Sequence, residues 1–181
     1  MSKIIFSFLS FFVAALAFVG CQSNSVAPVT DNVPGSTLSK RVVENVTGSG
    51  NFFINNTLRV FTLTAKRYND GSVDGHFNLN NHTAGVHYSG DVTVFTVVGN
   101  IVYWGGFITN SNSDVPGYGP GAGAFSAAID NGQGQNNLPD QVTLVLSGLG
   151  LTQSDLEDYC NLGQYFVSNL ADVEAGNIQI H

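Results

Sequence analysis

Two histidines and an aspartate lie close together in a stretch that alternates polar and apolar residues. Asp74 and His76 are two positions apart, and His87 follows after a polar turn. If residues 80 to 83 form that turn, equal strand register places His76 opposite His87 and Asp74 opposite Ser89, with side chains about 5 Å apart. Two imidazoles and one carboxylate at this separation predict a site for a divalent metal ion such as zinc.

The alternative for the same residues is a pair of neutral histidines on a solvated sheet face. No fourth ligand is visible near Asp74, His76 and His87, whereas a closed zinc site has four ligands. The solvated face is therefore the favoured interpretation, and the metal site remains the alternative.

Three aromatic residues, Tyr103, Trp104 and Phe107, lie in one stretch rich in β-forming residues. In the mouth of a barrel, these side chains, together with Tyr118 and Phe125, can line a pocket for a hydrophobic ligand. Aromatic residues more often belong to the core. Both interpretations stay open for these three residues.

Patterns typical of hydrolases, calcium loops and nucleotide-binding loops are absent from the sequence. There is no Gly-x-Ser-x-Gly nucleophile elbow. The glycine-rich stretch at 117–123 has no lysine after it, and a phosphate-binding loop needs one. Asp70-Gly71 and Asp130 lack the spacing of an EF-hand. We therefore expect no cofactor and a non-enzymatic role.

A period of two residues dominates from residue 42 onward, which predicts β-strands. The expected strands that follow one another at hairpin spacing are 58–65, 73–79, 86–88, 91–98 and 101–109. Apolar residues on both faces of 58–65 predict a strand packed on both sides. Residues 69–72 supply the Asn, Asp and Gly of a tight turn between strands.

The second half of the chain adds three expected strands, a loop and a helix. The strands are 124–129, 141–146 and 175–181, and the loop is the Gly- and Pro-rich stretch 110–123. Thr152, followed three residues later by Asp155, predicts a short helix near 152–159. The sequence thus predicts an all-β fold: an antiparallel meander forming a small β-barrel or two-sheet sandwich of about eight strands, with one short helix.

The charge of the chain excludes some classes of partner. The formal net charge is −7 at pH 7, and no Lys or Arg follows Arg67. A surface with few cations cannot neutralise phosphates, so we expect neither nucleic acid nor anionic lipid as a ligand. Charged residues make up only 10% of the chain, so the polar surface must consist mostly of Asn, Ser, Thr and Gly.

The first twenty residues have the layout of a secretory signal peptide. Lys3 precedes an apolar run from Ile4 to Val19, and the small residue Gly20 ends the segment. A membrane-spanning helix needs about 20 apolar residues, more than this run provides. We therefore expect residues 1–20 to be a signal peptide.

The segment Phe18-Val19-Gly20-Cys21 resembles the lipobox of bacterial lipoproteins, in which the cysteine thiol receives a diacylglycerol and the new N-terminus is acylated. The resemblance implies that Cys21 is lipidated and anchors the exported protein to a membrane. Gln22 follows the cysteine, which by resemblance to Gram-negative sorting implies the outer membrane. We expect residues 21–39 to form a flexible tether and residues 40–181 to form a single β domain.

Several spaced motifs in the domain resemble a group of uncharacterised secreted bacterial proteins. They include Val46-Thr47-Gly48-Ser49-Gly50, Asp70-Gly71-Ser72-Val73-Asp74-Gly75, Gly90-Asp91-Val92-Thr93, Asp130-Asn131-Gly132 and Glu174-Ala175-Gly176-Asn177-Ile178-Gln179. The group has no assigned activity to carry over. It often has a cysteine at the position of Val94, which by resemblance could pair with the equivalent of Cys160. With Val94 in this chain, that pairing is impossible.

The leading functional interpretation is a membrane-anchored lipoprotein with a non-enzymatic binding or structural role in the cell envelope. Its partner would be an envelope component or an extracellular ligand. The alternative is a small barrel that binds or isomerises a hydrophobic molecule. A hollow interior lined by aromatic residues would favour the alternative, and a filled interior the first. The oligomeric state is left open.

Overall fold

The computed structural model describes residues 39–133, 138–163 and 169–181. Within the chain, contacts group Leu38–His181 into one compact unit. The expected signal peptide, the expected lipidation site Cys21 and nearly all of the expected tether lie outside the described residues.

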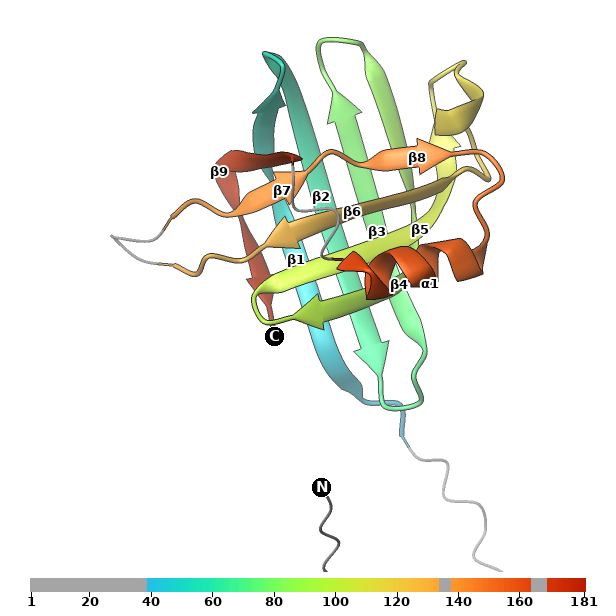
Figure 1. The fold of residues 1–181 in the computed structure, drawn as a ribbon, viewed down its shortest axis with the longest axis vertical. Helices are drawn as coiled ribbons and strands as arrows, with labels where there is room; N and C mark the ends of the chain where they lie inside the picture. Colours follow the sequence, from blue (N-terminus) through green and yellow to red (C-terminus); the bar gives the residue numbers. More distant parts are fainter. Residues whose placement is uncertain (1–38, 134–137, 164–168) are drawn as a thin grey trace, which may run out of the picture. The chain divides into compact units, whose positions relative to one another are not determined.

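The described residues form nine strands and one α-helix (Figure 1). The first five strands are β1 (Val42–Ile54), β2 (Thr57–Tyr68), β3 (Val73–Asn81), β4 (Val86–Val98) and β5 (Ile101–Ser111). After a short 3-10 helix, η1 (Pro116–Tyr118), follow β6 (Gly123–Ile129), β7 (Gln141–Thr143), β8 (Leu146–Gly148), α1 (Gln153–Asn161) and β9 (Leu170–Ile180).

The strands pair antiparallel in the order β5-β4-β3-β2-β1-β9-β7-β6-β8, and β5 also pairs with β6. This last pairing closes a ring of hydrogen bonds. Among the described strands, β8 pairs only with β6, so the ring contains the other eight. The all-β meander is confirmed, and closure of the ring decides for a barrel over a sandwich, because closure removes the free sheet edges.

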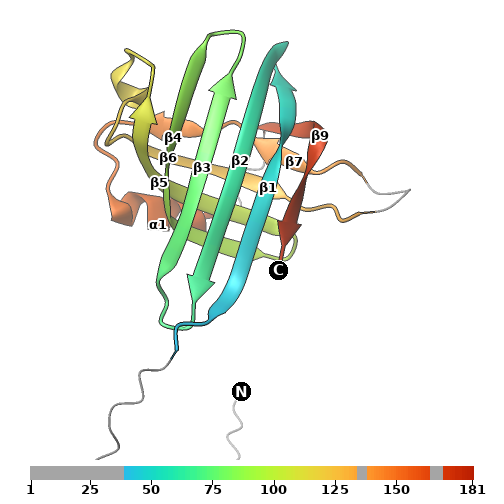
Figure 2. The ribbon, with the colours of Figure 1, turned by 180° about the vertical axis from the view of Figure 1, so that it is seen from behind.

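Strands β4 and β5 bend together and carry the sheet around one corner of the barrel (Figures 1 and 2). Their register shifts between Ser89 and Gly90 and again between Val92 and Val94, which are positions of β-bulges. Glycines allow the backbones to approach there. A Cβ on Gly106 would lie 1.9 Å from the carbonyl oxygen of Asp91, so no larger residue fits at that position.

The inner face of the barrel is filled with apolar side chains. The largest buried ones are Phe52, Phe61, Phe77, Leu79, Tyr88, Phe95, Trp104 and Ile108. Strand β2 shows the underlying period of two, since Leu63 is buried whereas Thr62 and Thr64 are exposed. The expected packing of this strand on both faces is therefore wrong, because its outer face meets solvent.

Helix α1 packs on the outer face of β4 and β5, and its existence near residues 152–159 is confirmed. The Thr152 hydroxyl accepts a hydrogen bond from the Asp155 N–H, and the Asp155 carboxylate accepts one from the Thr152 N–H at 2.7 Å. This reciprocal cap fixes the first turn. Leu156 and Cys160 are buried against the strands, and Gly105 leaves the space that Leu156 needs.

The expected single strand at 141–146 is wrong in detail. It is two short strands, β7 and β8, which pair with opposite ends of β6 and are separated by Leu144 and Val145. Strand β9 pairs with β7 but not with β8. The barrel wall therefore has a break in its ladder beside β8, which we call the seam.

Two carboxylates complete the wall along the other half of β9. The backbone N–H groups of Ile178 and Ile180 donate to Asp140 at 2.6 Å and to Asp130 at 3.0 Å. Strand β7 is only three residues long and does not reach these positions. Side-chain oxygens thus replace the missing strand, as a buried N–H group requires.

Candidate functional site

The predicted metal residues do not meet. The turn between β3 and β4 comprises residues 82–85, not 80–83, so the register differs from the expected one. His76 lies opposite Asp91, and His87 lies opposite Asn80. The expected pairing of His76 with His87 is therefore wrong, as is that of Asp74 with Ser89.

The observed neighbours of these residues form no cluster of metal ligands. His76 Nδ1 lies 3.6 Å from Asp91 Oδ1, and both side chains are more than half exposed. The backbone of His87 is paired with Asn112, whose side-chain oxygen accepts the His87 N–H at 2.7 Å. Over residues 39–133, 138–163 and 169–181, no three His, Cys, Asp or Glu side chains lie close enough to share a metal ion. The proposed three-residue set of Asp74, His76 and His87 thus has no common centre.

The three aromatic residues proposed to line a pocket face different surroundings. Trp104 belongs to the barrel core, with its ring 4.9 Å from that of Phe77. Its neighbour Tyr103 faces the opposite side of the sheet and packs in a cluster with Cys160. Phe107 is half-buried. Tyr103, Trp104 and Phe107 therefore do not form one pocket wall.

Val94 packs against the same outer cluster of Tyr103 and Cys160. This is the position at which the resembling secreted proteins were expected to carry a cysteine near Cys160. In this chain the contact is made by packing alone, and the Cys160 thiol is free and buried.

Within the part of the chain that the structure describes, apolar side chains fill the centre of the barrel. The central cavity, lined in part by Phe61, Phe77 and Trp104, has a volume of about 20 Å³. That is about the space of one water molecule. The filled interior favours a surface-binding or structural role over a ligand carried inside the barrel.

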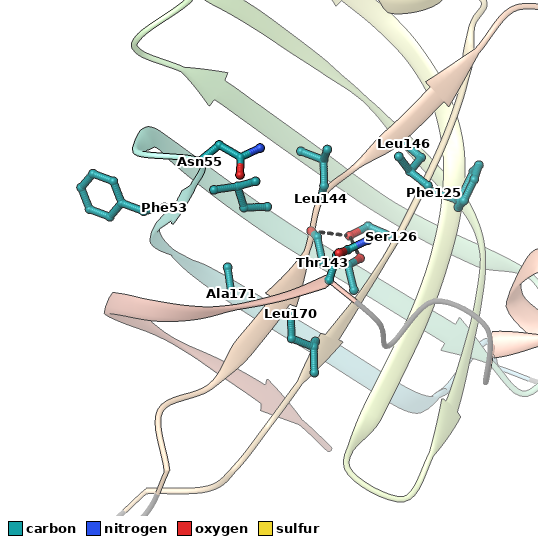
Figure 3. Close-up of a pocket in the computed structure, with 11 residues that line it drawn as sticks. Phe53, Asn55, Phe125, Ser126, Thr143, Leu144, Leu146, Leu170 and Ala171 are labelled. Atoms are coloured by element: carbon teal, nitrogen blue, oxygen red, sulfur yellow. Dashed lines mark hydrogen bonds between the residues drawn. The ribbon is translucent and has the colours of Figure 1, made fainter.

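A larger pocket of about 580 Å³ lies at the seam (Figure 3). The end of β1, the break between β7 and β8 and the start of β9 surround it. Its described lining residues are Phe53, Ile54, Asn55, Phe125, Ser126, Thr143, Leu144, Leu146, Asn169, Leu170 and Ala171. Phe53 is 47% exposed and Leu146 is 45% exposed, so the rim of the pocket offers apolar surface to a ligand.

A small polar group forms part of the pocket wall. The Ser126 and Thr143 hydroxyl oxygens lie 3.0 Å apart, and Thr143 also accepts the Ala127 N–H at 3.0 Å. The Ser126 hydroxyl contacts the Thr143 carbonyl at 3.1 Å. These bonds hold both side chains in place. Among the described lining residues none is ionisable, so they offer binding contacts but no general acid or base.

Sequence reasoning predicted Phe125 as a pocket residue, and Phe125 lines the seam pocket, but it missed the rest of this pocket. The signal for it is Leu144-Val145-Leu146, three consecutive apolar residues that interrupt the alternation of the expected strand. A strand cannot bury three consecutive side chains on one face. Such a run therefore indicates either two-sided packing or, as here, a break in the strand.

Two buried side chains, Cys160 and Tyr88, have raised pKa values, and neither is in a reactive ionised form near pH 7. Burial raises the pKa of the Cys160 thiol to about 12. Burial, followed by the influence of Tyr118, also raises the pKa of the Tyr88 hydroxyl well above its ordinary value. Both groups are therefore neutral near pH 7, and Cys160 lacks the thiolate form that a nucleophile requires.

None of the helices within the described ranges has both the length and the apolar character needed to cross a membrane. The chain as a whole matches no protein-family model, no curated protein and no solved structure.

Proposed function

We propose that the chain is an exported lipoprotein, anchored through lipid on Cys21, whose β domain binds an envelope component or extracellular ligand without catalysis. The observation that supports binding over catalysis is the seam pocket, because its described lining has no ionisable side chain. The filled barrel interior and the separation of His76 from His87 also support binding over catalysis.

The anchoring half of the proposal rests on the sequence before the domain. An apolar run that ends in Gly20-Cys21 and is followed by a polar stretch is the layout of a lipoprotein signal. Several acyl chains give durable attachment, unlike a single one. The outer membrane is the proposed destination, since Gln22 follows the cysteine.

Cells that express the chain with radiolabelled palmitate test the anchor. The wild-type protein should carry label and sediment with membranes, whereas Cys21→Ser should remain an unlabelled precursor. Cys160→Ser is the matched control, because it removes the other cysteine and should keep the label. Label that persists in Cys21→Ser would refute the proposed anchor.

A second candidate is binding of a small hydrophobic molecule at the seam, which the pocket of about 580 Å³ favours. A neutral apolar dye, N-phenyl-1-naphthylamine, should fluoresce when it enters. Ala171→Trp fills the pocket and should abolish that signal. Ala175→Trp, placed on the exposed part of the same strand, should not. Equal dye binding by both variants would exclude the seam as the site.

A further inference from the structure

Two arginines on the inner face of β2 lie toward opposite ends of the strand, and their surroundings differ. The period of two that buries Phe61 also turns Arg59 and Arg67 inward. Arg67 donates to the Glu44 carboxylate at 3.0 Å, and its guanidinium lies 4.7 Å from the centre of the Phe95 ring. Arg59 is half-buried, and its Nε is buried without a hydrogen-bond partner among the described residues. The two arginines thus share a strand face, but in the described domain only Arg67 has an acid partner.

The unpaired state of Arg59 is unfavourable for the protein alone. A guanidinium stays charged in proteins, and partial burial of a charge costs free energy unless a partner compensates it. Neither ion pair of the described residues includes Arg59, and the internal gaps 134–137 and 164–168 contain no Asp or Glu. A buried polar atom that the protein leaves unpaired is often explained by a bound ion. Arg59 therefore indicates a site for an anion.

Two tyrosines add hydroxyl groups near Arg59. The ring centres of Tyr88 on β4 and Tyr118 on η1 lie 5.6 Å apart. Tyr88 is 2% exposed and Tyr118 is 37% exposed, and no hydrogen bond among the described residues uses either hydroxyl. Burial and then Tyr118 raise the pKa of the Tyr88 hydroxyl, whereas Arg59 lowers it, and no carboxylate contributes. The Tyr88 hydroxyl is therefore protonated near pH 7 and can donate a hydrogen bond.

The register of the sheet brings Arg59 toward Tyr88. Leu79 on β3 lies opposite both Phe61 on β2 and Tyr88 on β4. Arg59 is the inner-face residue before Phe61, so its backbone lies about 10 Å from that of Tyr88 across two strand spacings and about 7 Å along the strands. Both side chains are long and point inward, so the guanidinium and the hydroxyl approach each other over β3, in agreement with the effect of Arg59 on the Tyr88 pKa. Figure 2 shows β2, β3 and β4 side by side, with η1 at the upper end.

The donors in this part of the barrel match a single carboxylate. Guanidinium and protonated phenol groups donate hydrogen bonds, and an ionised carboxylate only accepts them. Arginine can hold a carboxylate through two parallel bonds and neutralises its one charge, whereas a phosphate group carries about 1.5 to 2 negative charges near pH 7. We propose that Arg59, Tyr88 and Tyr118 bind the carboxylate of a small monocarboxylic acid. This site goes beyond the envelope-binding role, and none of its three residues is among the described lining of the seam pocket.

Fluorine NMR of the full-length protein with 4-fluorobenzoate as the probe tests the proposal. The protein is kept in a polyoxyethylene detergent, and protein-free micelles give the background. The probe should bind, and its binding should weaken at high salt because an ion pair contributes. 4-Fluorobenzamide, which has a similar shape without the charge, should bind at least tenfold more weakly. Inorganic phosphate should compete with the probe at least tenfold more weakly than unlabelled benzoate does.

Three variants connect binding to the named residues. Arg59→Met removes the charge but keeps an unbranched side chain, and should weaken binding at least tenfold. Tyr118→Phe removes one hydroxyl and should weaken binding about tenfold, as the loss of a hydrogen bond to a charged group does. Arg41→Met removes an exposed arginine just before β1; it is the matched control and should bind as wild type. Circular dichroism of each variant checks that the fold is kept.

Thermal unfolding without the probe separates a binding role of Arg59 from a structural one. Arg59→Met removes a partly buried charge that has no partner, so its unfolding midpoint should equal or exceed that of the wild type. Arg67→Met breaks the pair with Glu44 and should lower the midpoint.

Four results would overturn the proposal. The first is no binding of 4-fluorobenzoate by the wild type. The second is binding that Arg59→Met leaves intact while the variant remains folded. The third is an affinity for 4-fluorobenzamide or phosphate equal to that for the probe. The fourth is a midpoint that falls as far in Arg59→Met as in Arg67→Met, since the protein itself would then supply the partner of Arg59.

Discussion

The Asp140 carboxylate accepts the backbone N–H of Ile178 at 2.6 Å, across a sequence separation of 38 residues. Its second oxygen accepts the N–H of Asn131 at 2.9 Å. Asp140 is only 7% exposed, so one buried acid joins β9 to the loop that follows β6. This contact closes the barrel wall at a level that β7 is too short to cover.

Asp140→Ala should lower the free energy of unfolding by about 2–4 kcal/mol. The variant loses the two hydrogen bonds that the Asp140 side chain accepts and leaves the buried Ile178 N–H without a partner. Urea denaturation followed by circular dichroism measures the change. Asp114→Ala, in an exposed loop, should stay within about 0.5 kcal/mol of the wild type. An equally small effect at Asp140 would mean that other contacts hold this part of β9 in the barrel wall.

Trp104→Ala and Phe107→Ala should differ strongly, although both remove an aromatic side chain from β5. Trp104 is 5% exposed and belongs to the barrel core, so its truncation should cost about 3–5 kcal/mol. Phe107 is half-buried, so its truncation should lower the free energy of unfolding clearly less. Thermal unfolding of the two variants makes the comparison. The reverse order would place Phe107, not Trp104, in the core.

The Cys160 thiol should resist alkylation in the native protein. Its pKa is raised to about 12 by burial, so at pH 8 almost no thiolate is present to react. Iodoacetamide should modify Cys160 only after denaturation. Rapid modification of the folded Cys21→Ser variant, in which Cys160 is the remaining cysteine, would contradict the observed burial.

The same raised pKa has a consequence for stability at high pH. The unfolded thiol ionises near its ordinary pKa and the folded thiol only near 12. The contribution of Cys160 to stability is therefore complete below about pH 8.5 and is lost as the pH rises toward 12. Cys160→Ala should show a shallower loss of stability over this window in denaturant titrations. Parallel curves for the two proteins would contradict the expected linkage.

The cap of helix α1 predicts the opposite pH dependence. Hydrogen bonds from the Thr152 hydroxyl and N–H hold the pKa of Asp155 below its ordinary value. The contribution of this cap is present above the ordinary pKa and is lost as the pH falls through the lowered one. Asp155→Asn should therefore flatten the acid side of the stability profile. Unchanged acid dependence would indicate that the cap is not populated in solution.

Local signals in the sequence predicted the elements well. The turn at Asn69-Asp70-Gly71 forms as expected: Gly71 has a φ of +81°, and the Asp70 carboxylate accepts the Ser72 N–H at 2.9 Å. The helix at Thr152 follows from its capping box in the same way. Such features depend on residues a few positions apart, which a single sequence displays directly.

The register of β3 with β4 could not be read in this manner. Four residues in succession, from Asn80 to Thr83, are compatible with a turn. The position is decided by Gly85, whose φ of +64° ends the turn. This difference of two residues moved His87 away from His76 and removed the expected metal set. The β5–β6 pairing that closes the ring and the bond between Asp140 and Ile178 join residues far apart in the sequence, which no local pattern reveals.

The most direct test of the account is the mass of the N-terminal peptide of the protein isolated from membranes. The account predicts a peptide that begins at Cys21 and carries a diacylglycerol and an amide-linked acyl chain, with no peptide from residues 1–20. A peptide that begins at Met1, or one cut elsewhere without lipid, would contradict it.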